Sequence, residues 1–372
     1  MTFTTVAPTQ SATYDSRNRV HIYTDPLGQT TSYGYDGLNR LHTITYQDGS
    51  SNTITWDAGN RPTQFADTLN GTISRQYGGM NSLTEESGPH GTVDYFYDAA
   101  ERRMKMVVSG QSTAMTYQYD NGNRLTQIAQ GTTIVGTGYD ALSRRSSISL
   151  PNGIVTTPTY DDASELTALS YDRSGVHVGD LAYGYDAAGR RTSQGGSLAT
   201  LGLPTTVNTA SYDAANRLTS WGGTAITYDG NGNMLGVGAS TYTWNTRNQL
   251  TATSDGIGAF SYDPLGRRVS RTVSGATVPY LYDGDNPATV SGNQILAGQW
   301  FDDFFAQVTP GGTQSYLSDA FGSTVAVTNS SGAVTSSYSY GPYGSTTIDG
   351  TAETVFQYTG RENDGATNLY YL

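Results

Sequence analysis

Side chains that could carry out chemistry are few in this sequence of 372 residues, and they lie far apart. There is no cysteine, which excludes thiolate catalysis, thiolate metal sites and disulfide bonds. Four histidines, His21, His42, His90 and His177, lack the spacing of metal ligands or of a catalytic triad, so we expect them in surface or turn positions. The sequence also has no glycine-rich phosphate loop and no serine-centred nucleophile elbow. We therefore predict no catalytic, cofactor-binding or metal-binding residue.

One pair of adjacent carboxylates stands in an apolar setting, Asp302 and Asp303 in the segment QWFDDFF. Two carboxyl groups in such a setting could share a proton and act as an acid–base dyad. Adjacent residues of a strand, however, point to opposite faces of the sheet. We expect these two side chains to order a turn.

Two acidic segments resemble calcium-binding loops, residues 229–233 (DGNGN) and residues 283–286 (DGDN). Both lack the glutamate that closes such a loop with two ligand oxygens, and both fall where a turn already demands these residue types. A turn is the favoured interpretation, with calcium binding left as the alternative. The DPLG segments at residues 25–28 and 263–266 are interpreted as turns with proline at the second position.

The overall composition is that of β-strands joined by tight turns. Only 36% of residues are hydrophobic, whereas glycine reaches 45 residues and tyrosine 28. The formal net charge of −12 argues against a nucleic-acid partner, because there is no basic surface to neutralise phosphates. Lys105 is the only lysine, so nearly all positive charge is carried by arginine. No window has the roughly 20 apolar residues of a membrane span, and the amino terminus does not have the pattern of a signal peptide.

A short motif recurs along the whole chain, as YDGLNRL from Tyr35, YDNGNRL from Tyr119 and YDAANRL from Tyr212. Between Tyr14 and Tyr160 the aromatic residue that opens the motif recurs every 20 to 22 residues, and after that the spacing is looser. A motif that recurs this often indicates a repeat architecture, not a catalytic site. The structural residues that we assign to these Tyr-Asp (YD) turns are Tyr35, Asp36, Arg40, Tyr119, Asp120, Gly122, Asn123, Arg124, Tyr139, Asp140, Tyr185, Asp186, Arg190, Tyr212, Asp213, Arg217, Tyr262, Asp263 and Arg267.

A second, glycine-centred turn signal lies between successive motifs, for example Asp48-Gly49 and Asn152-Gly153. Each repeat therefore consists of strand, turn, strand and turn, and Asn-Gly and Asp-Gly pairs favour hairpin turns. The sequence predicts an all-β fold of roughly 60% strand, a spiral array of hairpins that forms one strongly curved, continuous sheet.

The residue types of the motif predict a turn that is held closed by side-chain contacts. Asp120 can accept hydrogen bonds from backbone N–H groups of the turn, and Gly122 and Asn123 tolerate a left-handed backbone. Arg124 starts the next strand beside an aromatic ring, where a planar guanidinium can stack and also pair with the aspartate. A lysine does neither as well, which accounts for the preference for arginine.

The repeated Tyr-Asp, Asn/Gly, Arg, Leu pattern resembles the YD repeats of the Rhs family, which includes the shells of insecticidal Tc toxins and the teneurins. Residues 280–287 (YLYDGDNP), 315–334, 338–345 (YSYGPYGS) and 356–372 resemble the Rhs repeat-associated core. The resemblance implies two regions: residues 1–290, a YD-repeat hairpin array, and residues 291–372, a truncated core segment. In the family, an aspartyl self-cleavage element follows this point of the core, so we expect the printed sequence to lack it.

The resemblance also implies a function. In the family such shells are structural, non-catalytic parts of secreted or cell-surface bacterial proteins, and they enclose a polymorphic C-terminal toxin for delivery. The partners implied are that toxin or cargo and a secretion carrier, with self-association through open sheet edges. The alternative is a cell-surface carbohydrate-binding or adhesion module. Buried tyrosine rings would favour the shell, whereas a row of solvent-facing rings would favour the binding module.

Overall fold

The computed structural model describes residues 9–200, 209–254, 258–351, 353–367 and 369–371. Strands make up 57% of them, and the other regular elements are two short 3-10 helices, η1 (Tyr358–Gly360) and η2 (Gly365–Thr367). The all-β fold predicted from the sequence is confirmed, with a strand content close to the expected value. The described strands, however, belong to an 18-stranded, a 16-stranded and a 2-stranded sheet, where the sequence led us to expect one continuous sheet. Within these ranges, no helix is long and apolar enough to span a bilayer.

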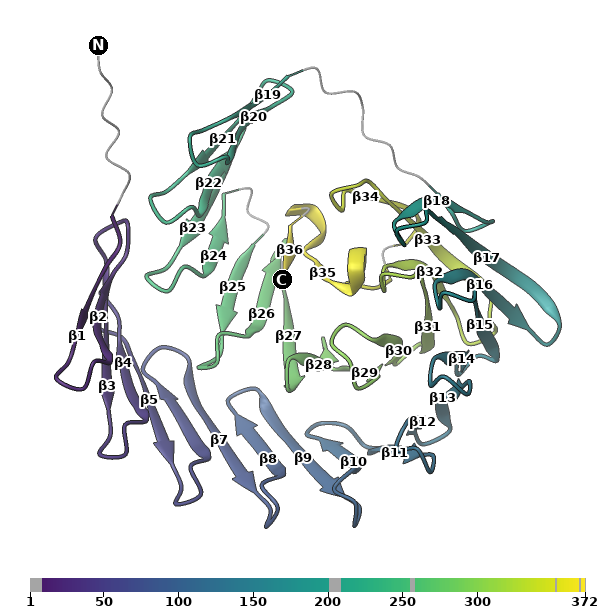
Figure 1. Ribbon diagram of the computed structural model, residues 1–372, viewed down its shortest axis with the longest axis horizontal. Coiled ribbons are helices and arrows are strands. Elements are labelled where there is room, and N and C mark those ends of the chain that lie inside the picture. The colour runs from purple at the N-terminus through teal and green to yellow at the C-terminus, as the bar shows by residue number, and fades with distance from the viewer. Residues whose placement is uncertain (1–8, 201–208, 255–257, 352, 368, 372) are drawn as a thin grey trace. The chain divides into compact units, whose positions relative to one another are not determined.

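The chain divides into two compact units, and each combines an early and a late stretch of the sequence. Unit 1 comprises residues 1–92 and 206–279, and unit 2 comprises residues 93–205 and 280–372. In both units, neighbouring strands along the chain pair in antiparallel hairpins, which Figure 1 shows as a succession of arrows in alternating directions.

The strands of unit 1 come in two series. The early strands are β1 (Ser11–Tyr14), β2 (Val20–Thr24), β3 (Thr30–Tyr35), β4 (Leu41–Thr45), β5 (Ser51–Trp56), β6 (Pro62–Asp67), β7 (Gly71–Tyr77) and β8 (Leu83–Gly88). The late strands are β19 (Ala210–Tyr212), β20 (Leu218–Trp221), β21 (Thr224–Tyr228), β22 (Met234–Val237), β23 (Ser240–Trp244), β24 (Leu250–Thr253), β25 (Ala259–Tyr262) and β26 (Arg268–Val273).

Unit 2 has the same organisation with strands that are longer on average, and the first strand of each of its two series begins a few residues before the unit boundary. Its early strands are β9 (Gly91–Tyr97), β10 (Arg103–Val108), β11 (Met115–Tyr119), β12 (Leu125–Gln130), β13 (Thr133–Tyr139), β14 (Arg145–Ser149), β15 (Ile154–Tyr160), β16 (Leu166–Arg173), β17 (Val176–Tyr185) and β18 (Arg191–Gly195). Its late strands are β27 (Ala276–Asp283), β28 (Asn286–Val290), β29 (Asn293–Ala297), β30 (Phe304–Thr309), β31 (Gly312–Ser318), β32 (Thr324–Thr328), β33 (Val334–Tyr340), β34 (Thr346–Gly350), β35 (Glu362–Asn363) and β36 (Tyr370–Tyr371).

The YD turn has one backbone design in every hairpin that carries it. The pairing register shifts by one residue at the aromatic residue, between Gly34 and Tyr35 and again between Gly138 and Tyr139. The fourth residue after the aromatic residue has a left-handed backbone, for example Asn39 at φ 67°. Asparagine adopts this conformation at little cost, which explains its frequency at this position.

Side chains from the two strand series meet inside each unit. In unit 1, the Nδ2 atom of Asn52 donates to the Pro264 carbonyl at 2.7 Å. In unit 2, the hydroxyl of Tyr171 on β16 donates to the carbonyl of Ser318 at the end of β31 at 2.7 Å. Figure 1 shows these parts of unit 2 beside one another, in teal and yellow-green. The core of unit 2 lies between them and contains fully buried Ile154, Leu181 and Leu317.

Candidate functional site

The YD turn between β11 and β12 closes through the carboxylate of Asp120. One oxygen of this carboxylate accepts the backbone N–H groups of Gly122 at 2.8 Å and Arg124 at 3.0 Å. The other oxygen pairs with the Arg124 guanidinium at 2.7 Å. The Arg124 side chain and backbone hydrogen bonds hold the pKa of Asp120 below its ordinary value. Only Asn123 has a left-handed backbone here, at φ 61°; Gly122 does not, contrary to our expectation.

In seven of the described turns, the arginine covers the aromatic ring of the following repeat. Arg124 lies over Tyr139 at 4.8 Å, whereas Tyr119, the ring of its own motif, is covered by Arg102. The sequence placed arginine beside a ring but did not reveal which one. The start of β12 lies between the ends of β11 and β13, and the guanidinium turns toward β13. Equivalent contacts, with 4.1 to 5.4 Å from guanidinium carbon to ring centre, are Arg19–Tyr35, Arg40–Trp56, Arg61–Tyr77, Arg102–Tyr119, Arg144–Tyr160 and Arg217–Tyr228.

The aromatic residue also reaches back to the preceding repeat. The Tyr139 hydroxyl donates to the carbonyl of Leu125 at 2.8 Å, and burial raises the pKa of this phenol. The same bond, 2.7 to 3.1 Å long, joins Tyr35 to Val20, Trp56 to Leu41, Tyr77 to Pro62, Tyr119 to Arg103, Tyr160 to Arg145, Tyr185 to Leu166, Tyr228 to Leu218, Trp244 to Met234 and Tyr262 to Leu250. We call the guanidinium contact and this hydrogen bond together the repeat brace.

The remaining predicted turn residues occupy this arrangement with local differences. Asp–Arg ion pairs within a turn join Asp36 to Arg40, Asp140 to Arg144, Asp186 to Arg190, Asp213 to Arg217 and Asp263 to Arg267. Tyr262 lies at the end of β25 and donates to Leu250, whereas Tyr212 on the short strand β19 is 58% exposed.

Several turns depart from the motif without leaving its aspartate unpaired. Where Asp is replaced by Gly78, the arginine position holds Ser82, so both members of the pair change together. At the β21–β22 turn, the Asn233 amide donates to the Asp229 carboxylate at 2.9 Å. The turn at Asp161 differs because its arginine position is Glu165.

A set of buried and half-buried ion pairs links the two strand series, and sequence reasoning missed it. In unit 1, Arg247 pairs with Asp67 at 2.6 Å, with side chains only 8% and 0% exposed. In unit 2, Arg103 pairs with Asp283 at 2.6 Å. Each pair joins residues 180 positions apart. The sequence signal that could have indicated these ion pairs is an arginine outside the fixed motif position, such as Arg247.

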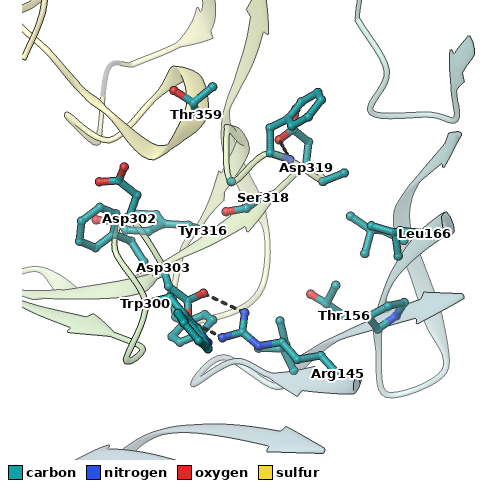
Figure 2. A pocket seen from close by; sticks show the side chains of 18 of the residues that line it. Arg145, Thr156, Leu166, Trp300, Asp302, Asp303, Tyr316, Ser318, Asp319 and Thr359 are labelled. Carbon is teal, nitrogen blue, oxygen red and sulfur yellow. Dashed lines mark hydrogen bonds and ion pairs between the residues drawn. The ribbon is translucent and has the colours of Figure 1, made fainter. Parts of the chain in front are cut away.

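Unit 2 also contains a cavity of about 410 Å³ between its two strand series. Figure 2 shows Asp302, Asp303 and Tyr316 on one side and Thr156 and Leu166 on another. A volume of this size is in the range of small-molecule pockets. The carboxylates that line it are nevertheless engaged by protein groups.

Asp302 and Asp303 do not form a dyad. Asp303 makes a two-pronged ion pair with Arg145, whereas Asp302 pairs with Arg361 at 3.0 Å. Burial raises the pKa of Asp302, and Arg361 opposes this effect. Asp302 has a left-handed backbone, at φ 60°, in the loop between β29 and β30.

The other candidate residues are either exposed or already engaged by protein groups. All four histidines are exposed; His42 contacts the Ile54 carbonyl at 2.9 Å, and His177 contacts Asp172 at 3.0 Å. In the two segments that resemble calcium loops, Asp229 accepts from Asn233, and Asp283 pairs with Arg103. Among the described residues, no group of three or more histidine and acidic side chains is arranged to hold a metal ion.

Comparison with solved structures finds proteins that share this fold. The crystal structure of TcdB2-TccC3 covers 97% of this chain with a TM-score of 0.73 and 15% identity, and 26% of that chain is matched. The Tc holotoxin pore of Photorhabdus luminescens matches the same share with a TM-score of 0.51 and 14% identity, over 29% of that chain. At these identities the likeness shows the fold alone.

Curated relatives are longer proteins that share only part of their length with this chain. The tRNA3(Ser)-specific nuclease WapA of Bacillus spizizenii is 30% identical over 208 residues, which are 52% of this chain and 9% of that protein. The tRNA nuclease WapA of Bacillus subtilis (strain 168) is 30% identical over 210 residues, with the same two shares.

Two family profiles match the chain. The RHS repeat matches residues 14–51, which confirms the resemblance drawn from the sequence. The teneurin YD-shell profile matches residues 154–372, more than half of the chain. The chain therefore belongs to the teneurin YD-shell family.

Proposed function

We propose that the chain is a non-catalytic, structural section of a YD-repeat shell that encloses a toxin domain of the same longer protein. The observation that carries the proposal is the repeat brace. It engages the carboxylate, the guanidinium and the phenol of successive motifs with one another, so these groups serve to hold hairpins together. Groups engaged in this way are not free to act as acid, base or nucleophile.

The relatives support a toxin-associated role. The solved structures that share the fold belong to Tc toxins, and the names of the curated relatives are those of nucleases. This chain matches only 9% of those nucleases. We assign the chain to the shell and place any nuclease or other toxic activity in a separate domain.

The wider assignments follow from this role. We propose residues 1–290 as the hairpin array and residues 291–372 as the core segment, in a parent protein that is secreted or displayed on the cell surface. The cargo domain is the principal partner, with a secretion carrier as a second. We also propose self-association through open sheet edges, because unpaired strand edges invite pairing with another chain.

A carbohydrate-binding or adhesive role is the second candidate, and exposed aromatic residues favour it. Trp300 is 74% exposed and Tyr343 is 85% exposed, and aromatic faces of this kind contact sugars in many binding sites. The rings of the YD motifs, in contrast, are mostly half-buried and covered by arginine. We rank the shell first for this reason.

The test is protease protection of the cargo. The complete core, including this chain, is expressed with its own downstream domain and treated with protease alongside that domain alone. We expect the downstream domain to survive in the complex far longer than alone. Equal rates of digestion would refute enclosure, and binding of the chain to a glycan array would then favour the adhesive role.

A further inference from the structure

The YD turn between β15 and β16 places a carboxylate where the other turns place a guanidinium. Nine described turns pair Asp with Arg four residues later. In this turn Asp161 faces Glu165 instead. Other departures remove the acid together with the arginine or replace the arginine with an amide donor. Among the YD turns that the structure describes, only this one sets acid against acid.

The rest of this turn is built like its neighbours. The N–H of Glu165 donates to the Asp161 carboxylate at 2.9 Å, as Arg124 does in its own turn. The Tyr185 hydroxyl donates to the Leu166 carbonyl at 2.9 Å, so the next ring is held in the usual position. Within the described residues, no arginine or lysine covers this ring.

Three kinds of group hold a guanidinium in the complete repeats. Arg124 pairs with the Asp120 carboxylate, covers the Tyr139 ring and donates to the Asp140 carbonyl at 3.3 Å. Their counterparts at the β15–β16 turn are the carboxylate of Asp161, the ring of Tyr185 and the carbonyl of Asp186. The groups that hold a guanidinium in other repeats are therefore present here. At the position of the arginine, however, the chain supplies the Glu165 carboxylate.

Nearby cations are committed elsewhere. Arg144 pairs with Asp140, covers Tyr160 and donates to the Ser164 hydroxyl at 3.0 Å. Arg190 pairs with Asp186, and its side chain is 80% exposed. Burial and the charge of Asp161 raise the pKa of Glu165, with a further contribution from Asp186. The Glu165 carboxylate is thus close to two other acids, and in the part of the chain that the structure describes it forms no ion pair.

We propose that Asp161, Glu165 and the face of the Tyr185 ring form a binding site for a guanidinium, supplied by an arginine-bearing peptide segment of a partner. Arginine fits because its planar group can pair with carboxylates and stack on an aromatic face at once, whereas an ammonium group lacks the planar fork. The site is partly exposed, so one arginine binds weakly and a partner gains affinity from additional contacts.

Titration with N-acetyl-arginine methylamide, followed by NMR of the isotope-labelled chain, tests the proposal. We expect shifts concentrated at the backbone amides of residues 161–165 and 185–189 and at the Tyr185 ring. The turn at Asp140 and Arg144 is the internal control and should not respond. The corresponding citrulline derivative, which is similar in shape but uncharged, should cause no such shifts.

Two variants separate binding from folding. Glu165→Arg restores the common motif, so it should abolish the response to the probe and raise the urea midpoint of unfolding. Glu165→Gln removes one charge while keeping the shape, and should weaken binding at least several-fold. Wild-type binding should also weaken as the pH falls and Glu165 takes up a proton.

Three results would overturn the proposal. Undiminished binding in the Glu165→Arg chain would place the probe elsewhere. Equal shifts from the citrulline derivative would show that charge recognition is absent. Stronger shifts of the same residues with calcium chloride would identify a metal site in place of an arginine site.

Discussion

The buried pair of Arg247 and Asp67 gives the sharpest test of what holds unit 1 together. The Arg247 guanidinium makes two contacts to the Asp67 carboxylate, at 2.6 and 3.2 Å, and donates to the Ser50 hydroxyl at 2.9 Å. It also lies over the Tyr46 ring at 4.1 Å. Replacing Arg247 with methionine keeps the aliphatic stem but leaves a carboxylate buried without a cation.

The expected cost follows from burial. Removing one member of a buried ion pair typically costs about 3–5 kcal/mol, because the remaining charge stays out of water. Asp67 still accepts the N–H groups of Leu69 at 2.9 Å and Asn70 at 3.0 Å, so we expect the lower end, about 3 kcal/mol. With a urea dependence of about 2 kcal/mol per molar, the midpoint should fall by about 1.5 M.

Tryptophan fluorescence during urea denaturation provides the assay. Trp56, Trp221 and Trp244 lie in unit 1, and Trp300 is the only tryptophan of unit 2. Because Trp300 is 74% exposed, a Trp300→Phe background should fold normally and report unit 1 alone. The double variant Arg247→Met with Asp67→Leu removes both charges and should recover most of the loss.

The matched control is Arg217→Met, because Arg217 pairs with Asp213 at the surface with side chains 38% and 25% exposed. Exposed pairs contribute little, so its midpoint should move much less. An Arg247→Met shift no larger than that of Arg217→Met would refute the reasoning that the buried pair secures the two strand series.

Three further outcomes are expected. The pKa is lowered in the folded chain for the aspartates of eight YD turns, Asp15, Asp36, Asp57, Asp98, Asp120, Asp140, Asp186 and Asp213, and it falls to about 2 for Asp15 owing to its hydrogen bonds with Arg19. The stabilisation by these carboxylates is complete above the unfolded pKa near 3.8, so the urea midpoint should fall as the pH drops from 3.8 toward 2, and a flat profile there would count against the ion pairs. Gly350→Ala should lower the free energy of unfolding by roughly 1–3 kcal/mol, because φ is 100° and a Cβ would lie 2.5 Å from a backbone oxygen. The control is Gly175→Asn, which should change the urea midpoint little because nothing lies within 4 Å of a Cβ there. The intact mass of the purified chain should stay constant over days, and a defined carboxy-terminal fragment would show that an internal aspartate is catalytic.

The sequence predicted the features that depend on residues close together in the chain. The period, the hairpins and the role of Asp120 in its turn all depend on residues that are neighbours along a few positions. The ring that Arg124 covers could not be predicted, because two motif rings flank the start of β12 and the choice depends on how the hairpins twist. Ion pairs such as Arg103 with Asp283 could not be predicted from the sequence for a different reason. They depend on how two distant strand series align, and a single sequence contains no measure of that alignment.

The repeat brace gives the array a direction. Each arginine needs the ring of the next repeat, and each ring needs a carbonyl of the previous one, so any block of one period carries the same connections at both ends. Gene duplication or recombination in whole periods would therefore lengthen or shorten the array without creating an unmatched joint. An arginine without such a ring is more exposed: Arg190, which covers no ring among the described residues, has a side chain 80% exposed, whereas that of Arg124 is 32% exposed.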